Sequence, residues 1–448
     1  MADYNLKIVI AGAGVAGLSA GVYLQQLGYT NILFIEASDR VGGRMKTEHV
    51  DGFTLDKGFH TFFTAYPYAS ELLDYSALDL KYFDSGALVL RNSSILKIKD
   101  PYRHPWSVFS MLFSGLGSLG DKLNMLKRRL EIRRMSENQI FEKFEVKTSS
   151  ILRKKKYSNL LIKNFFNPIF SAIFLDNNLT TSRRVFDYTF KMLIEGRVAI
   201  PAKGIEAIPK QLASHFGPQN FMFNKKVVAY EKKKITLDTN ESLNADLLIV
   251  ATEHNSLFAK LNNLPIKNDH RSSTCLYFSA TKKPFVSRMV CVNANDPKLV
   301  SSVTVLTNIH KGHAPQGKEL IAVNLNGFAR ADDDELESEV KFELTKTFGK
   351  SVGTWQLLKV YRIDYAIPNQ NFVLGRRQIN DMMIGESTYV CGDHLLYGSM
   401  NAAIKSSKNL VEIIHKNLNH GHKVKHKKKF DQLFETSHDD EHPTSPMP

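Results

Sequence analysis

Three glycines near the start of the chain stand at a spacing that lets a backbone wrap closely around phosphate groups. Gly12, Gly14 and Gly17 follow an apolar run in a GxGxxG pattern. The first permits a tight turn, the second admits a pyrophosphate next to the backbone, and the third lets a helix pack on the preceding strand. Glu36 lies 19 residues beyond Gly17, where a carboxylate accepts hydrogen bonds from ribose hydroxyls. The four residues predict a dinucleotide site.

This chemistry requires a strand, a helix and a second strand in fixed order. Residues 6–11 form a short apolar run rich in β-branched side chains, which is typical of a strand buried on both faces. Residues 18–27 are predicted to be helical and to end at Gly28, and residues 31–35 form the next apolar strand. The N-terminus of the helix would direct its N–H groups and its positive dipole end at the phosphates.

Two further segments extend the site beyond what a nicotinamide dinucleotide needs. Gly42 and Gly43 let the chain pass close to a cofactor, and Arg44 can pair with a phosphate. Near the other end of the chain, Gly392 and Asp393 follow an apolar strand and precede a helix predicted to begin at about residues 400–402. Together the two ends favour FAD, because a nicotinamide dehydrogenase would leave both segments without a role.

At these motifs the chain resembles the flavin-dependent amine oxidase superfamily, which includes phytoene-desaturase-like enzymes, protoporphyrinogen oxidases and monoamine or polyamine oxidases. The resemblance extends over nearly the whole chain, apart from about the last thirty residues. Lys203 stands where many members carry a second glycine. The segments that carry the resemblance are 36–44 (EASDRVGGR), 53–60 (FTLDKGFH), 201–209 (PAKGIEAIP), 226–228 (KVV), 245–252 (ADLLIVAT) and 391–393 (CGD).

The resemblance implies a set of cofactor contacts. Asp393 would contact the ribityl and phosphate region, the backbone near Val227 would contact adenine, and the helix from Met400 would direct its N–H groups at the flavin N1 region. The predicted FAD-binding residues are Gly12, Gly14, Ala16, Gly17, Glu36, Ala37, Gly43, Arg44, Gly58, Phe59, His60, Val227, Gly392, Asp393, Met400, Asn401 and Ala402.

Within the superfamily, the middle of the chain resembles the desaturase-like branch, at residues 164–174, 182–186 and 365–368. The chain contains no Ser-Gly-Gly-Cys segment of the kind by which monoamine oxidases bond FAD covalently, so the resemblance implies noncovalent FAD. It further implies hydride transfer from a substrate C–H to flavin N5. The aromatic density of residues 160–190 favours an apolar, isoprenoid or polycyclic substrate.

Two other functions stay open on these residues. An FAD-dependent amine oxidase would release hydrogen peroxide when it is given amines. A flavin-bound but non-catalytic, membrane-associated protein would hold FAD that no substrate reduces. These residues are equally compatible with an oxidase, a dehydrogenase and a redox-neutral isomerase. They are also compatible with either oxygen or a quinone as the electron acceptor, and with any oligomeric state.

His60 and Tyr365 are the candidate catalytic residues. The resemblance places the segment of His60 beside the flavin ring and that of Tyr365 at the opposite wall. His394 and Tyr397, in the loop before the last helix, are further candidates. Each of the four either acts as a general base or only shapes the site. A desaturase-like reaction needs no strong protein base if its substrate forms a stabilised cation.

The order of the motifs predicts an α/β fold. A discontinuous, Rossmann-like FAD-binding domain of the amine-oxidase type carries an α+β substrate-binding domain made from two insertions. The FAD-binding domain is assigned residues 1–80, 200–268 and 376–420, and the substrate-binding domain residues 81–199 and 269–375. The first insertion is expected to be mostly helical, with a long amphipathic stretch at 121–144. The second is expected to form a sheet with helices on one side, including a helix at 332–348 ended by Gly349.

The chain is strongly basic, with a formal net charge of +14. No nucleic-acid-binding motif accompanies this charge, so we expect no nucleic-acid partner. The excess is interpreted either as solvated surface or as attraction to an anionic membrane. Residues 104–120 contain no Asp, Glu, Lys or Arg and have basic residues on both sides, which predicts either a core helix or an interfacial dip. No segment is long and apolar enough to span a bilayer.

The three cysteines are too few and too widely spaced for a disulfide framework or a zinc site. They fit a reducing compartment, and no metal site is predicted. The first strand begins within a few residues of the N-terminus, which leaves no room for a signal peptide. We therefore expect a cytoplasmic protein, with peripheral contact at the inner membrane surface as the alternative. Residues 421–448 are predicted to be a disordered, charged tail.

Overall fold

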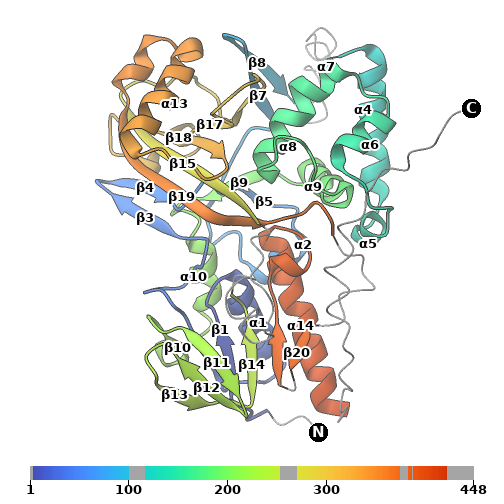
Figure 1. Cartoon of the computed structure of the whole chain (residues 1–448), viewed down its shortest axis with the longest axis vertical. Helices are drawn as coiled ribbons and strands as arrows, with labels where there is room; N and C mark the ends of the chain where they lie inside the picture. Colours follow the sequence, from blue (N-terminus) through green and yellow to red (C-terminus); the bar gives the residue numbers. More distant parts are fainter. Residues whose placement is uncertain (1–3, 100–116, 253–269, 374–381, 386, 421–448) are drawn as a thin grey trace, which may run out of the picture.

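The computed structural model describes residues 4–99, 117–252, 270–373, 382–385 and 387–420. These residues form two units that lie one above the other along the longest axis of the molecule (Figure 1). The lower unit in that view contains both the first strand and the last helix, and the upper unit contains a long sheet with helices around it. Segments far apart in the sequence therefore meet in the lower unit.

A six-stranded sheet lies at the centre of the lower unit. It consists of β1 (Ile8–Ala11), β2 (Ile32–Ile35), β10 (Phe221–Met222), β14 (Leu247–Val250), β20 (Met383–Gly385) and β21 (Thr388–Val390). The strand order is β10-β2-β1-β14-β21-β20. The first five strands of this order are parallel, and β20 is antiparallel to β21. Parallel strands end at a common edge, and that edge faces the upper unit.

Alternate side chains of β1 belong to two different cores. Ile8 and Ile10 belong to the cluster that contains the buried side chains of helices α1 (Val15–Gln26) and α14 (Met400–His420). Val9 and Ala11 pack with a second sheet of three strands. Those strands are β11 (Val227–Glu231), β12 (Lys234–Leu237) and β13 (Ser242–Asn244). Successive side chains of a strand point to opposite faces of the sheet. Because both faces of β1 are covered, every one of its side chains is buried.

A seven-stranded sheet forms the core of the upper unit. In spatial order its strands are β19 (Gln356–Pro368), β15 (His270–Ala280), β18 (Glu319–Asn326), β17 (Ser302–Val305), β16 (Cys291–Asn293), β7 (Gly86–Arg91) and β8 (Ser94–Lys99). All neighbours are antiparallel except the pair β16 and β7. The β7–β8 hairpin comes from the insertion expected to be mostly helical, so both insertions contribute to one sheet.

The upper sheet is covered on both faces, so the expectation of helices on one side only is wrong. Helix α13 (Asp333–Phe348) packs on one face beside Leu276 and Phe278. The opposite face, with Cys275 and Tyr277, packs on the hairpin of β3 (Thr47–Val50) and β4 (Phe53–Asp56). Further along that face, helix α8 (Asn167–Phe174) packs on β7 and β16. Both faces need cover because successive side chains of these strands are apolar on both sides.

The helical part of the first insertion is made of short helices. They are α4 (Leu119–Arg134), α5 (Glu137–Phe141), α6 (Thr148–Lys154), α7 (Asn159–Leu161), the π-helical turn η1 (Ile162–Phe166), α8 and α9 (Arg183–Glu195). The amphipathic stretch predicted at 121–144 is divided between α4 and α5. Ser136 begins a new helix because its Oγ accepts a hydrogen bond from Gln139 N while the Gln139 side chain accepts one from Ser136 N.

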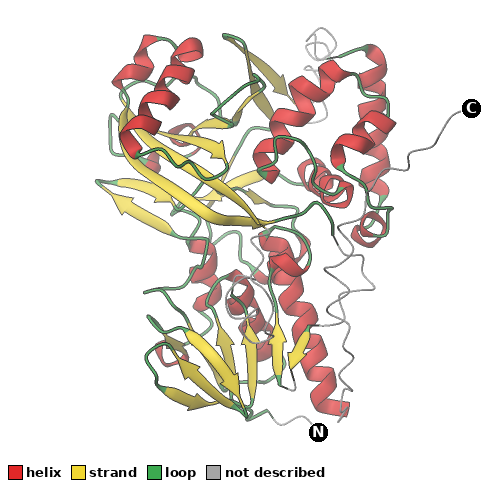
Figure 2. Cartoon of the chain, in the orientation of Figure 1, coloured by secondary structure: helices red, strands yellow, loops and turns green. Residues whose placement is uncertain are grey.

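Short elements connect the two units, as Figure 2 shows by the strands and helices between the large sheets. A small sheet contains β5 (Phe62–Phe63), β9 (Val198–Pro201) and β6 (Leu80–Tyr82). Further short helices of the described residues, not all of them between the units, are α2 (Pro67–Leu72), α10 (Ala207–Ala213), α12 (Leu306–Ile309), η2 (Pro218–Asn220), η3 (Lys311–His313), η4 (Lys350–Thr354) and η6 (Asp393–Leu395). Of these, η4 packs on α13 in the upper unit and η2 packs on β2 in the lower unit.

Two sequence predictions fall on residues outside the described part of the chain. They are residues 104–116 of the uncharged segment and the tail 421–448. Of the helices in the described ranges, none combines the length and the apolar character needed to cross a bilayer. Across those same ranges, no three His, Cys, Asp or Glu side chains gather so that they could hold a metal ion. The three cysteines are buried and unbridged.

Candidate functional site

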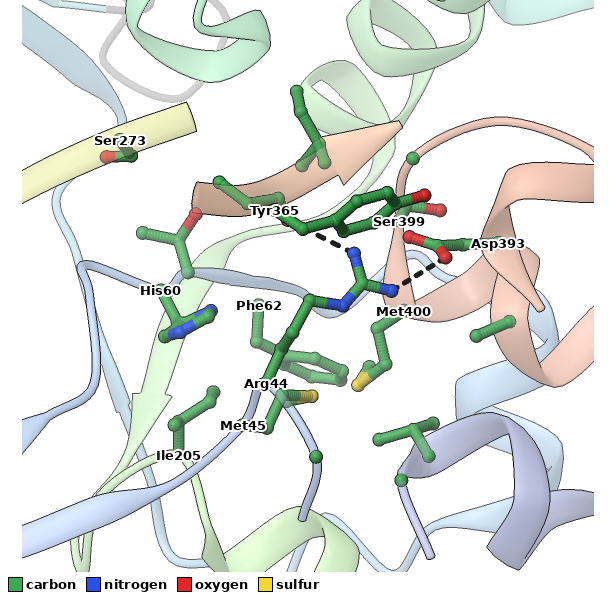
Figure 3. Close-up of a pocket in the computed structure, with 18 of the residues that line it drawn as sticks. Arg44, Met45, His60, Phe62, Ile205, Ser273, Tyr365, Asp393, Ser399 and Met400 are labelled. Carbon is green, nitrogen blue, oxygen red and sulfur yellow. Dashed lines mark hydrogen bonds and ion pairs between the residues drawn. The ribbon is translucent and has the colours of Figure 1, made fainter. Parts of the chain in front are cut away.

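A cavity of about 670 Å³ lies between the two units. It begins at the carboxyl ends of β1 and β2, where Gly12 and Glu36 line it, and it extends to the face of the upper sheet, where residues of β16 and β18 line it. Figure 3 shows its middle, where Arg44 lies between Tyr365 and Asp393. A crevice outside the carboxyl ends of parallel strands is where open α/β sheets bind ligands, and the volume is in the range of cofactor sites.

The turn after β1 has no space for side chains. Gly12 has a φ of +104°, and a Cβ there would lie 2.8 Å from the carbonyl oxygen of Ala251. A Cβ at Gly17 would lie 2.0 Å from the carbonyl oxygen of Gly12, so α1 packs directly on the turn. No side chain of the described residues caps the N-terminus of α1. Its first N–H groups are therefore suited to bind an anion in the cavity.

Glu36 is held in one orientation at the end of β2. Its Oε2 accepts a hydrogen bond from Ala13 N at 2.8 Å. Its Oε1 accepts hydrogen bonds from Ser38 N at 3.0 Å and from Ser38 Oγ at 2.6 Å. The residue is 9% exposed and lines the cavity. Because each carboxylate oxygen has further lone pairs, Glu36 can still accept hydrogen bonds from a diol bound there.

A second glycine loop touches the first. Gly42 forms a parallel bridge with Gly14. Gly43 has a φ of +58°, and a Cβ on it would lie 3.2 Å from the Cα of Gly14. Both loops line the cavity, so two stretches of bare backbone face the same part of it. This close approach explains why two glycines are needed after residue 41.

Arg44 joins the first and last cofactor motifs. Its Nη2 lies 2.7 Å from Asp393 Oδ1, and its Nη1 donates a hydrogen bond to the carbonyl oxygen of Ala366 at 3.1 Å (Figure 3). The guanidinium carbon lies 5.2 Å from the centroid of the Tyr365 ring. The Arg44 side chain thus connects residues more than 300 positions apart in the chain. It places positive charge in the middle of the cavity.

The two candidate catalytic residues both line the cavity. His60 Nε2 lies 3.1 Å from the carbonyl oxygen of Lys57, which can only accept, so Nε2 carries the hydrogen. Burial lowers the pKa of His60, and the nearby Arg44 lowers it further, which keeps the imidazole neutral near pH 7 with an accepting lone pair on Nδ1. Tyr365 lies on β19, is 8% exposed and packs between Arg44 and His270.

The structure brings most of the predicted cofactor residues to this cavity. Those that line it are Gly12, Gly14, Ala16, Glu36, Ala37, Gly43, Arg44, Phe59, His60, Val227, Gly392, Asp393 and Met400. Gly17, Gly58, Asn401 and Ala402 are not among the lining residues. The Asn401 side chain instead accepts a hydrogen bond from Tyr68 N at 3.0 Å and donates one to Tyr188 Oη at 2.9 Å, so it fastens α2 and α9 to α14.

The two further histidine and tyrosine candidates differ in position. His394 lines the cavity, whereas Tyr397 does not. Tyr397 is 4% exposed and donates a hydrogen bond to Glu137 Oε1 at 3.1 Å. Its hydroxyl therefore joins the loop before α14 to helix α5, which is a packing role.

Several lining residues were not among the predicted FAD-binding residues, although Lys226 belongs to the segment 226–228 noted above. Lys225 and Lys226 precede Val227, and Ser399 precedes α14. On the upper sheet, the lining includes Val292, Ser302 and Asn324. The charge of the lysine pair and its place before a predicted strand were visible in the sequence. The sheet residues could not be found, because which face of each strand points to the cavity depends on pairing between distant strands.

Asp56, in the segment that leads to Gly58, gives a testable pH dependence. Burial raises its pKa to about 6, against hydrogen bonds from Ile205 N and Thr47 Oγ1 that lower it. Between pH 4 and 6 the folded state then binds more protons at this site than the unfolded state, so the contribution of Asp56 to stability falls as pH rises. We expect Asp56→Asn to remove this decline, measured as the melting temperature at pH 4, 5, 6 and 7.

The exposed Asp39 provides the control for that measurement. Its side chain is 64% exposed, so Asp39→Asn should leave the pH profile of the melting temperature parallel to that of the unaltered protein. Parallel profiles for the Asp56→Asn variant and the unaltered protein would contradict the prediction.

Comparison with known proteins agrees with this geometry. The family model described as flavin containing amine oxidoreductase matches residues 15–415. The 15-cis-phytoene desaturase of Glycine max is 48% identical over 68 residues, which are 15% of this chain and only 12% of that relative. The local match is thus strong but short.

Solved structures show the same fold over nearly the whole chain. An oxidoreductase from Methanosarcina mazei has a TM-score of 0.68 at 17% identity and covers 91% of this chain and 100% of its own. Putrescine oxidase bound to putrescine has a TM-score of 0.66 at 14% identity, with 92% and 99% covered. The family match and the shared fold together show that the chain belongs to the flavin-containing amine oxidoreductase family, as an FAD-dependent oxidoreductase with a Rossmann-like FAD-binding domain and a substrate-binding domain.

Proposed function

We propose that the protein removes a hydride from a C–H bond of an apolar substrate, as desaturases do, with FAD held noncovalently in the cavity. FAD, when bound, supplies the hydride acceptor, and the chain binds and orients both molecules. In this proposal residues 1–80, 200–268 and 376–420 bind FAD. Residues 81–199 and 269–375 hold the substrate, and residues 421–448 form a charged tail.

The observation that carries the proposal is the apolar lining of the upper half of the cavity. Its members lie on α8, β9, α9, β16 and the loops beside them: Ile169, Ile173, Leu175, Leu193, Val198, Val290 and Val292. Such side chains hold a hydrocarbon by excluding water from it. A substrate of isoprenoid or polycyclic character matches this lining.

The charged residues of the cavity argue against an amine as the substrate. Among the described residues, the carboxylates that line it are Glu36 and Asp393. Glu36 is engaged by Ala13 and Ser38, and Asp393 is paired with Arg44. An ammonium group on the substrate side would therefore be buried without a counter-ion, which is strongly unfavourable. An uncharged substrate is favoured over a polyamine.

The lower half of the cavity has the features that FAD requires. The bare backbone of the two glycine loops and the uncapped N-terminus of α1 suit the pyrophosphate, and Glu36 suits the ribose. Ser399 and Met400, at the start of α14, line the cavity where a helix N-terminus favours negative charge. None of the three cysteines lines the cavity, which supports noncovalent binding. In this proposal His60 accepts a proton at Nδ1, and Tyr365 forms a wall of the substrate site.

The absorbance spectrum of the purified protein, recorded before and after acid precipitation, tests the proposal. A flavin band that moves into the supernatant is expected for noncovalent FAD. Anaerobic bleaching of that band by isoprenoids, followed by recovery with oxygen or a quinone, would support the desaturase activity and identify the acceptor. Hydrogen peroxide formed from amines would instead support an amine oxidase. FAD that no substrate bleaches would support a non-catalytic protein.

Helix α4 supports a contact with a membrane surface. Four leucines on one side of this helix face solvent: Leu119, Leu123, Leu126 and Leu130 are 66%, 66%, 40% and 44% exposed. We call them the leucine stripe. Basic residues Lys122, Lys127, Arg129 and Arg133 belong to the same helix. The helix lies at the outer edge of the upper unit (Figure 1). Apolar side chains beside basic ones match an anionic lipid surface, which we propose as the occupant.

Acidic substitutions in the leucine stripe should weaken this contact. We expect the double variant Leu123→Glu and Leu130→Glu to bind vesicles of three parts phosphatidylcholine and one part phosphatidylglycerol at least about tenfold more weakly. Each change removes an exposed leucine that contact with lipid would bury, and adds a negative charge that the anionic surface repels. Co-flotation with the vesicles measures this. Phe342→Glu on α13, where Phe342 is 69% exposed, is the matched control and should bind normally. Equal flotation of all three proteins would contradict the proposal.

A further inference from the structure

Four uncharged polar side chains interrupt the apolar surface at the far end of the cavity. Ser273 on β15, Ser302 on β17, and Asn324 and Asn326 on β18 all line it. They form two directly opposed cross-strand pairs, Ser273 with Asn326 and Ser302 with Asn324. Opposed residues of neighbouring strands point to the same face of a sheet. The four side chains therefore form one polar patch on the face of the upper sheet that lines the cavity.

Asn324 is the buried centre of this patch. It is 7% exposed, and its Nδ2 donates a hydrogen bond to Ser302 Oγ at 3.2 Å. Its Oδ1 is buried and has no hydrogen-bond partner among the described residues. The Oδ1 of Asn326 is likewise buried without a partner there, whereas its Nδ2 donates to Ser171 O and to Asn177 Oδ1. A buried acceptor without a donor costs stability, so its presence on the cavity wall points to a donor supplied by a ligand.

We infer that the polar patch binds a hydroxyl group of the substrate, so that the substrate is an apolar alcohol rather than a pure hydrocarbon. A hydroxyl can donate to Asn324 Oδ1 and accept from the Ser302 hydroxyl, which accepts one hydrogen bond from Asn324 and still has its own hydrogen to donate. The match does not depend on which way the amide is turned, because a hydroxyl both donates and accepts. No charged side chain belongs to the patch, so it suits a neutral group rather than a carboxylate or an ammonium.

The position of the patch gives it a role in orienting the substrate. It lies on the upper sheet, whereas Glu36, Arg44 and Asp393 line the cavity from the lower unit. If the substrate hydroxyl binds to this patch, the apolar part of the substrate would lie between the aliphatic side chains of the upper unit and the proposed FAD site of the lower unit. The patch would then decide which C–H bond is presented. This inference rests on the proposed function, because it takes the apolar half of the cavity as the substrate site.

Binding of two matched probes to the FAD-loaded protein tests the inference. Farnesol and farnesene have the same carbon count, and only farnesol carries a hydroxyl. We expect farnesol to bind about tenfold more tightly, measured by perturbation of the flavin absorbance and by the shift in melting temperature. Equal affinity for the two probes, or binding of neither, would overturn the inference.

Variants identify the residue responsible. Asn324→Leu should abolish the preference for farnesol, and Ser302→Ala, a smaller change, should reduce it. Without a probe, Asn324→Leu should melt no lower than the unaltered protein, because the unpartnered oxygen has been removed. Thr304→Val is the matched control. Thr304 is buried on β17, and its hydroxyl has no hydrogen-bond partner in the part of the chain that the structure describes, but the residue does not line the cavity, so the variant should keep the preference.

The outcomes separate this inference from the proposed function. If Asn324→Leu keeps the tenfold preference, the polar patch does not bind the hydroxyl. If the preference for farnesol is present and depends on Asn324, but no isoprenoid bleaches the flavin, the hydroxyl site is supported and the desaturase activity is contradicted.

Discussion

Replacement of Glu36 by alanine is expected to leave the purified protein largely without FAD. The carboxylate stands at the end of β2, accepts hydrogen bonds from Ala13 N and Ser38, and faces the cavity. In the proposed complex it also accepts from the two ribose hydroxyls. Hydrogen bonds to a charged group each contribute about 1.5–3 kcal/mol, so the loss should weaken FAD binding by about 100-fold or more. Titration of the apoprotein with FAD, followed by quenching of flavin fluorescence, measures the dissociation constant.

Two variants distinguish cofactor binding from a local structural effect. Glu36→Gln keeps an acceptor for Ala13 N but lacks the charge, so it should bind FAD with intermediate affinity. Asp39→Ala removes an exposed carboxylate only three positions away and should leave the affinity unchanged. Full FAD occupancy of the Glu36→Ala variant would show that this carboxylate does not hold the ribose.

Replacement of Asp187 by alanine should cause the largest loss of stability. Asp187 on α9 is fully buried and is paired with Arg128, which is 5% exposed, with Lys143 at 3.2 Å and with Arg183 at 3.7 Å. Without the carboxylate, Arg128 and Lys143 would keep only the more exposed Glu131 as a partner, and removing one member of a buried ion pair costs about 3–5 kcal/mol. For a protein of 448 residues, a loss of that order lowers the melting temperature by about 3–5 °C. Differential scanning calorimetry measures the change.

The surroundings of Asp187 supply the controls. Glu131 also pairs with Arg128, at 3.0 Å, but its side chain is 38% exposed, so Glu131→Ala should cost less than about 1 kcal/mol. Adding Arg128→Met to the Asp187→Ala variant should recover part of the loss, because one uncompensated cation is removed. A melting temperature of the Asp187→Ala variant close to that of the unaltered protein would contradict the prediction.

The front of the cofactor site could be predicted because its determinants are local in the sequence. The predicted strands at 6–11 and 31–35 are confirmed as β1 and β2 with small differences at their ends. The helix predicted from residue 18 begins at Val15, because Gly14 already has the extended conformation that precedes a helix. Likewise, the helix predicted at 332–348 is confirmed as α13, since the Asp332 side chain caps its N-terminus. Turns and caps are short-range features, so a sequence reveals them.

The substrate side could not be predicted in the same way. The β7–β8 hairpin joins a sheet whose other strands follow about 200 residues later, and no local pattern indicates that pairing. Asn324 left a weak signal, as a polar residue within the apolar strand 319–326. Asn324 can be recognised as part of the polar patch only once β17 pairs with β18 and places Ser302 opposite it. Pairing between distant strands therefore decides which side chains meet in the cavity.

The arrangement of the lower sheet has a consequence for biosynthesis. β1 pairs with β2 and β14, β14 in turn pairs with β21, and α14 then closes the site, with Ser407 Oγ donating a hydrogen bond to Ala16 O at 2.7 Å. A ribosome needs on the order of 20 to 80 s to travel from β1 to β21 at ordinary elongation rates. During that time β21 and α14 are not yet available to the glycine turn of a nascent chain. Capture of the cofactor must therefore wait until translation is nearly finished, and a chain that ends early cannot retain it.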